Sequence, residues 1–222
     1  IDVILGVPIA LLLARDWTGV AVVRVLVLLP LSLPPVVAGL ALLATFGRRG
    51  MVGASLHAAG ITIAFSTAAV ILAQVYVSLP FFITTLESSL RARSRQLEQT
   101  AAALGAGPWR VLTTITLPTV FPALGRGTAL AAARCLGEFG ATITFAGSLQ
   151  GVTRTMPLQV YLARETDSGT AMALGLVLVV VGAIVVGFTQ SRLSQCPRRR
   201  DKSVFVGLNP PAQQPSRQSP VE

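Results

Sequence analysis

The sequence predicts an all-helical integral membrane protein with about five transmembrane helices. Of its 222 residues, 52% are hydrophobic and only 12% are charged, and long apolar stretches alternate with short connectors that carry arginine. This composition is typical of chains that lie in a lipid bilayer. The formal net charge of +9 comes from arginines in the connectors and near the C-terminal end. That distribution fits orientation in a membrane better than nucleic-acid binding, so lipid is the expected partner and nucleic acid is not.

No pattern typical of an enzyme active site or a metal site occurs in the sequence. Cys135 lies in an apolar stretch and Cys196 in a basic tail, without the spacing of metal ligands. His57, the single histidine, has no cysteine or carboxylate beside it in the sequence. We therefore expect no catalytic residue, no metal ligand and no cofactor in this chain.

The first two apolar stretches differ in length and in proline content. The stretch from Val3 to Ala14 is shorter than the roughly 20 residues that cross a bilayer, so the first helix is expected to be truncated at its N-terminus. The stretch from Val25 to Gly47 contains three prolines, two of them at Pro34 and Pro35. Proline at membrane depth is tolerated where a segment packs on protein or lines a wet path. We expect a kinked or partly unwound span with both residues as pathway candidates; an ordinary kinked helix is the alternative.

Three more apolar stretches complete the expected spans: Ile61 to Leu86, Leu117 to Gly147, and Ser168 to Ser191. Together the five spans define a transmembrane domain over residues 1–192. Residues 193–222 are basic and rich in proline, glutamine and serine, a composition that cannot bury enough apolar surface to fold alone. They are expected to form a disordered cytoplasmic tail.

The distribution of arginine predicts the orientation of the chain. The connector between the third and fourth spans is rich in positive charge, with Arg91, Arg93, Arg95 and Arg110. Because positive charge accumulates in cytoplasmic loops, this connector is expected inside, which leaves Arg48 and Arg49 outside against the trend. The connector after the fourth span is then external. There Pro157 is expected to open a short helix that ends near Arg164 and serves as a lid or docking surface.

The fourth span carries charges at membrane depth. Arg134 and Glu138 lie four residues apart, about one helical turn, so their side chains can pair. An ionisable group in the bilayer costs roughly 3 kcal/mol on insertion scales and usually faces protein or water. Two interpretations stay open: the pair stabilises a translocation pathway or gate, or it is purely structural and neutralises itself.

The arginine-rich connector has an unusual local pattern. Residues 98–104 are mostly strong helix formers, Gly105 and Gly107 interrupt them, and Pro108 suits the first turn of a second helix, where no N–H donor is needed. The sequence therefore predicts two short helices joined at a tight glycine elbow.

This connector resembles the cytoplasmic coupling loop of ABC import permeases over about residues 95–116. The family pattern is Glu-Ala-Ala, three residues, Gly, nine residues, Ile, one residue and Leu-Pro. Gly105, Ile115, Leu117 and Pro118 fit its spacing.

The acidic part of the coupling pattern is shifted. Its Glu-Ala-Ala positions fall on Gln99, Thr100 and Ala101, so Gln99 replaces the family glutamate. Glu98 lies one residue early and, because one residue turns a helix by about 100°, points to a different face.

The resemblance implies a type I ABC importer permease fold and a division of labour. The small residues Ala101, Ala102 and Gly105 would let the first short helix lie in a cleft of an ABC ATPase subunit on the cytoplasmic side. ATP is then bound and hydrolysed by that partner, and the chain itself is not an enzyme. The resemblance further implies a homodimer, a multi-pass position in a bacterial cell membrane, and an extracytoplasmic binding protein.

Four other stretches resemble the oxyanion branch of these permeases, which carries molybdate, tungstate and sulfate: residues 30–37, 47–50, 134–142 and 153–157. The resemblance extends over roughly residues 1–192. Phe139 followed by Ala141-Thr142, and Gly-Arg-Arg-Gly at 47–50, are more similar to the molybdate members. The resemblance thus implies import of molybdate, with tungstate as a second cargo, from an oxyanion-binding protein.

Three alternatives compete with this interpretation. A sulfate or thiosulfate importer of the same branch is the nearest. An ion-coupled secondary transporter should show internal repeats with broken helices in matching halves, which the sequence lacks. A membrane-embedded enzyme would need a nucleophile or metal set, and Cys135 with Glu138 alone is thin support.

Overall fold

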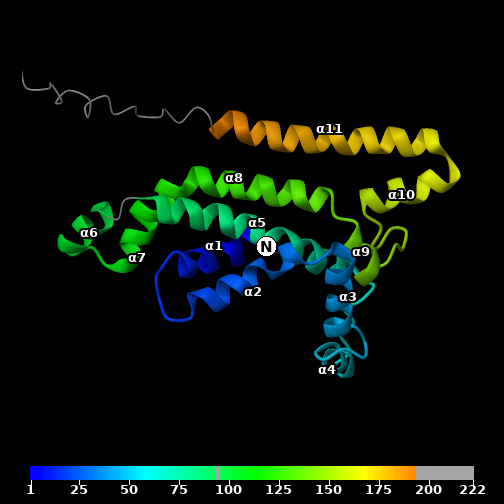
Figure 1. The fold of residues 1–222 in the computed structure, drawn as a ribbon, viewed down its shortest axis with the longest axis horizontal. Helices are drawn as coiled ribbons and strands as arrows, with labels where there is room; N and C mark the ends of the chain where they lie inside the picture. Colours follow the sequence, from blue (N-terminus) through cyan, green and yellow to red (C-terminus); the bar gives the residue numbers. More distant parts are fainter. Residues whose placement is uncertain (94–95, 194–222) are drawn as a thin grey trace, which may run out of the picture.

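The computed structural model describes residues 1–93 and 96–193, with side chains as far as residue 187, and all regular secondary structure in that part is helical, as expected (Figure 1). The elements in order are α1 (Asp2–Leu13), α2 (Val20–Ser32), α3 (Pro35–Phe46), α4 (Gly53–Ala58), α5 (Thr67–Ala92), α6 (Gln96–Ala103), α7 (Pro108–Val111), a π-helical turn (Leu112–Thr116), α8 (Leu117–Leu136), α9 (Gly140–Phe145), α10 (Met156–Thr166) and α11 (Ser168–Leu193).

The centre of the molecule is α5, which packs against α1 and α8. Phe82 of α5 is fully buried between Gly6 of α1 and Gly127 of α8. A Cβ at Gly6 would lie 2.3 Å from the Phe82 ring, so only glycine lets α1 approach this closely. Close approach through small residues is a common way for helices to associate in lipid.

Two of the described helices are long and apolar enough to cross a membrane, α5 and α11. The pair α2 and α3 adds a third span only if the two are counted together, because they meet at a bend of 118°. The helix α1 is apolar but has 12 residues. Five spans therefore stay a prediction.

The second apolar stretch breaks at its prolines, which confirms the expectation of a kinked or partly unwound span. Helix α2 ends at Ser32, Leu33 and Pro34 are extended, and α3 begins at Pro35. Proline suits the first turn of a helix because its missing N–H has no intrahelical partner there. Figure 1 shows α3 turning away from the axis of α2, with α4 at its far end.

The third and fourth stretches need correction. The third was expected at Ile61–Leu86, but α5 runs from Thr67 to Ala92, because residues 61–66 form a loop in which Phe65 has a positive φ of 59°. The fourth was expected as one span from 117 to 147. It is interrupted after Leu136, and α9 starts only at Gly140.

Other local predictions are confirmed. The connector forms two short helices, α6 and α7, with Gly105 at φ +85° between them and Pro108 in the first turn of α7. The short helix expected at Pro157 is α10, with Pro157 in its first turn, while its external position stays a prediction. Arg95, Cys196 and the tail from residue 194 lie outside the described residues.

Candidate functional site

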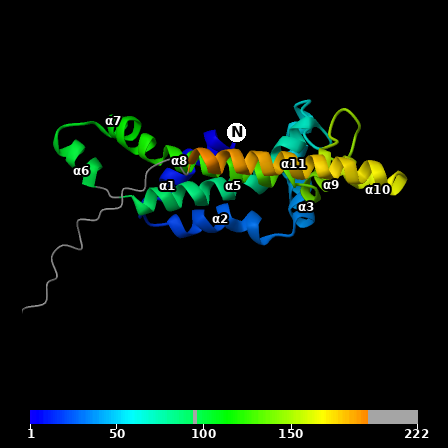
Figure 2. The same ribbon diagram turned by 90° about the horizontal axis from the view of Figure 1, so that it is seen from above.

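The coupling candidates lie beyond one end of the helical bundle, where α6 and α7 project (Figures 1 and 2). No residue of either short helix is buried. Three large apolar side chains of this segment are exposed: Leu97 at 64%, Leu104 at 83% and Trp109 at 76%. Apolar groups of this size on a polar connector suit contact with another protein surface.

Glu98 is turned toward the bundle. Its carboxylate accepts a hydrogen bond from Arg93 Nη2 at 2.6 Å and another from the hydroxyl of Thr116 in the π-helical turn. Glu98 thus ties α6 both to the end of α5 and to the start of α8. Gln99, the residue at the family's glutamate position, lines the same cavity as Glu98.

The remaining coupling candidates occupy three settings. The Thr100 hydroxyl donates to the Gln96 carbonyl at 2.9 Å, and Ala101 is half-buried. Gly105 has open space where a Cβ would stand. Ile115 is half-buried in the π-helical turn, while Leu117 and Pro118 open α8 and line a shallow groove.

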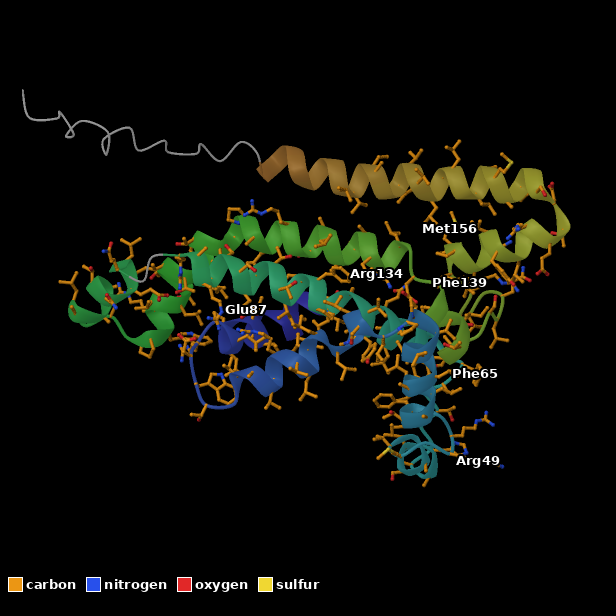
Figure 3. All side chains as sticks on the ribbon, viewed as in Figure 1. Arg49, Phe65, Glu87, Arg134, Phe139 and Met156 are labelled. Atoms are coloured by element: carbon orange, nitrogen blue, oxygen red, sulfur yellow. The ribbon has the colours of Figure 1, made fainter. Side chains whose placement is uncertain are left out.

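A charge cluster that sequence reasoning missed holds the same end of the bundle together. Glu87 of α5, 8% exposed, accepts hydrogen bonds from Arg24 of α2 at 2.5 Å and from Arg91 at 2.9 Å (Figure 3 labels Glu87). Arg91 also donates to Asp16 at 3.4 Å and to the Leu13 carbonyl at 2.6 Å. The four-residue spacing of Glu87 and Arg91 was the available signal. The cluster brings the ends of α1, α2 and α5 together beside α6.

The charged pair of the fourth stretch is formed at the break between α8 and α9. Arg134 Nη1 lies 2.8 Å from Glu138 Oε2, and the Glu138 side chain is only 1% exposed. The other carboxylate oxygen, Oε1, accepts the backbone N–H of Ala141 at 2.7 Å. Glu138 therefore neutralises Arg134 and also satisfies a donor in the first turn of α9. Figure 3 shows Arg134 at the end of α8 beside this break.

The proline break and the Arg134–Glu138 pair, the two groups of pathway candidates, lie close together because α3 packs against α9. A Cβ on Gly140 would lie 2.8 Å from Cβ of Pro35, and a Cβ on Gly39 would lie 1.7 Å from Thr144 Oγ1. Pro34 and Pro35 are exposed at the α2–α3 break, while Glu138 lies two residues before Gly140. Two helix interruptions are thus adjacent, and each leaves backbone polar groups outside the regular helical hydrogen-bond pattern.

Polar side chains hold the connector between α9 and α10 in place. Arg154 donates to the Ser148 carbonyl at 3.3 Å and to Gln159 at 3.4 Å, which closes the loop before α10. The ring of Phe139 lies 5.1 Å from that of Tyr161, so α10 contacts the α8–α9 break. Hydrogen bonds from the Thr170 hydroxyl and from the Gly169 N–H lower the pKa of Asp167, which lies just before α11.

Among residues 1–93 and 96–193, no three histidine, cysteine, aspartate or glutamate side chains are grouped so that they could hold a metal ion. The expectation of no metal, cofactor or catalytic residue stays a prediction.

Comparison with known proteins identifies the family. Residues 5–198 match the family described as binding-protein-dependent transport system inner membrane component. The chain belongs to this family. As a member, with long apolar helices, it is an integral membrane protein.

Similar proteins include permeases named for molybdenum transport and for sulfate transport. It is 58% identical over 185 residues to the molybdenum transport system permease protein ModB of Mycobacterium tuberculosis, covering 83% of this chain and 70% of the relative. It is 41% identical to ModB of Escherichia coli, covering 88% and 86%. The sulfate transport system permease protein CysW of Escherichia coli is 31% identical, covering 90% and 70%.

A solved structure confirms the permease fold. The bacterial alginate ABC transporter, in complex with its alginate-bound periplasmic protein, contains a chain that superposes with a TM-score of 0.66 at 19% identity. The match covers 87% of this chain and 72% of that chain.

Proposed function

We propose that this chain is the membrane-spanning permease subunit of an ATP-driven importer that carries molybdate, and also tungstate, into the cell. The observation that carries the proposal is the gradient of identity, 58% and 41% to two molybdenum permeases against 31% to a sulfate permease. The family-like stretches 30–37 and 137–142, which meet through the α3–α9 contact, support the same assignment.

In this proposal α6 and α7 receive the stroke of an ABC ATPase. The exposed Leu97, Leu104 and Trp109 supply apolar surface for the partner, and ATP stays with that subunit. Because Glu98 links α6 to Arg93 of the α5 end and to Thr116 before α8, a displacement of α6 is transmitted to two helices of the bundle.

Thr116 lies at the start of α8, and Arg134 and Glu138 lie at and just after its end. We place the gate at this second end. A dianion that crosses a bilayer needs positive potential without a tight trap. An arginine partly neutralised by a carboxylate meets both requirements, and the adjacent helix breaks at Pro34–Pro35 and Glu138 let the surrounding backbone rearrange.

The proposed assembly is a homodimer of this chain in the bacterial cell membrane, with ATPase subunits on the cytoplasmic side and an oxyanion-binding protein outside. The family description, binding-protein-dependent transport, supports the external partner.

Uptake by cells that lack this gene tests the substrate. Labelled molybdate uptake at limiting concentration should fall strongly and return with the wild-type gene, while sulfate uptake should persist. Normal molybdate uptake in a strain without a redundant importer, together with lost sulfate uptake, would transfer the chain to the sulfate branch.

A separate variant tests coupling. Gly105→Leu places a bulky side chain at an exposed position with positive φ, so the elbow is strained and the partner surface is filled. Transport and co-purification of the ATPase should both fall. Unchanged uptake and unchanged association would show that this elbow is not the coupling element.

A further inference from the structure

A cavity of about 580 Å³ lies where the end of α1 faces α5, α6 and α7. Pockets for small organic ligands span about 300–1,000 Å³, so this cavity is of ligand size. One part of its wall is apolar, with Leu11, Leu90 and Leu112, and another part is polar, with Arg15, Arg93 and Gln99. The occupant should therefore have an apolar and a polar portion.

Arg93 offers hydrogen-bond donors to an occupant. Its side chain is only 14% exposed, and Nη2 is engaged with Glu98 at 2.6 Å. The other two nitrogens, Nε and Nη1, are buried and have no hydrogen-bond partner within the described residues. Since buried donors of a charged group are rarely left unpaired, an acceptor ligand is the expected partner.

The second cation of the cavity is Arg15, which is exposed and whose side chain forms no ion pair or hydrogen bond with residues 1–93 and 96–187. The carboxylates in the lining are already compensated, Asp16 by Arg91 at 3.4 Å and Glu98 by Arg93 at 2.6 Å. The lining holds two arginines and two carboxylates, Arg15 and Arg93 with Asp16 and Glu98. Because Asp16 is paired with Arg91, which lies outside the lining, Arg15 has no counter-charge there. The cavity is therefore suited to an anion.

The position of the cavity indicates which anion. It lies at the ends of the apolar helices α1 and α5, beside the coupling elements, and the proposed function places that end at the cytoplasmic membrane surface. Basic pockets between membrane helices on the cytoplasmic side suit anionic lipid headgroups. A phospholipid also matches the division of the lining, because its phosphate meets arginine while its first carbons meet leucine.

We propose that this cavity binds the headgroup of an anionic phospholipid from the cytoplasmic leaflet, with Arg93 and Arg15 holding the phosphate oxygens. The inference rests on the proposed orientation of the permease. Because the lining includes both α1 and α6, a bound lipid ties the coupling elements to the helical bundle.

Native mass spectrometry of the purified full-length transporter, titrated with phosphatidylglycerol and with phosphatidylcholine, tests the proposal. Phosphatidylglycerol should bind preferentially. Arg15→Gln should weaken its binding about fivefold, the change expected for one basic group at an anionic lipid surface. Arg93→Lys, which keeps a cation for Glu98 but removes the unpaired guanidinium donors, should weaken it by a similar factor.

Arg110→Gln is the matched control, because Arg110 is exposed on α7, outside the lining, and the charge change is the same. It should leave binding unchanged. Equal affinity for the two lipids, or equal losses in Arg15→Gln and Arg110→Gln, would overturn the proposal. Displacement of phosphatidylglycerol by equimolar inorganic phosphate or molybdate would assign the cavity to a free oxyanion instead. The lipid titration itself contains no ATP or cargo, so its result stands or falls separately from the molybdate assignment.

Discussion

At the α3–α9 contact and at the α6–α7 elbow the chain depends on glycine for opposite reasons. A Cβ at Gly39 would overlap Thr144 Oγ1, 1.7 Å away, whereas nothing lies within 4 Å of a Cβ at Gly105, whose φ is +85°. The contact is fixed by close packing, and the elbow is fixed by backbone conformation and a few polar side chains such as Glu98. Substitutions should therefore damage stability at the first region and coupling at the second.

The largest effect is expected at the α8–α9 break, next to the packed contact. Glu138→Ala leaves Arg134 without its counter-charge and the Ala141 N–H without its acceptor. Removing one member of a buried pair typically costs about 3–5 kcal/mol. Thermal unfolding in detergent and membrane abundance should both show the loss.

The double change Arg134→Leu with Glu138→Leu separates structure from gating. A purely structural pair can often be replaced by apolar residues, so stability should recover in part, although the acceptor for the N–H of Ala141 stays missing. Recovered abundance with lost transport would support the pathway role. Recovered abundance with normal transport would leave only the structural one.

The second prediction compares the same substitution, glycine to asparagine, in the two regions. Gly39→Asn should destabilise by about 1–3 kcal/mol or more, because the side chain has no room. Gly105→Asn should cost less, since asparagine tolerates positive φ, and less than Gly105→Ala, for which a left-handed conformation costs about 1–2 kcal/mol. Unfolding midpoints of the three variants give the ranking. Equal losses at 39 and 105 would contradict the distinction between packing and backbone control.

Much of the local structure could be predicted from sequence. The proline break at 34–35, the glycine elbow and the short helix at Pro157 all depend on residues whose backbone preferences act locally. The pairing of Arg134 with Glu138 also follows from helical spacing, since i and i+4 share a face.

Contacts between segments that are distant in the chain could not be predicted from the sequence. Arg24 and Glu87 are 63 positions apart, and nothing local indicates that α2 brings them within 2.5 Å. The start of α5 was misplaced because residues 61–65 are mostly apolar yet form a loop, in which the Phe65 N–H donates to the Phe145 carbonyl at 3.3 Å. The inward direction of Glu98 likewise depends on Arg93 and Thr116.

The third prediction concerns the elbow, where coupling should fail with little loss of stability. Glu98→Gln removes the charge opposite Arg93 but keeps an acceptor for Thr116. Because glutamine keeps a neutral acceptor for Arg93 and Thr116, the loss in unfolding free energy should be smaller than for Glu138→Ala, which removes the acceptor altogether. Cargo-stimulated ATPase activity of the complex should fall. Gln99→Glu, which restores the family residue, should be tolerated, and equal behaviour of the two variants would contradict the inward role of Glu98.

The smallest effect is expected outside both regions, at the start of α11. Asp167 accepts hydrogen bonds from the Gly169 N–H at 2.9 Å and from the Thr170 hydroxyl at 2.5 Å, and these bonds lower its pKa below the ordinary 3.8. A carboxylate whose pKa is lower in the folded state stabilises that state above its unfolded pKa, and this contribution is lost as the pH falls through the folded value. The unfolding midpoint of wild type should therefore exceed that of Asp167→Ala at neutral pH, with the difference shrinking below the ordinary value of 3.8. Asp167→Asn, which keeps a neutral acceptor, should lie between them at neutral pH and show no such convergence of its own. A difference between wild type and Asp167→Ala that stays constant through the acid range would show that the hydrogen bonds to Asp167 do not depend on its charge.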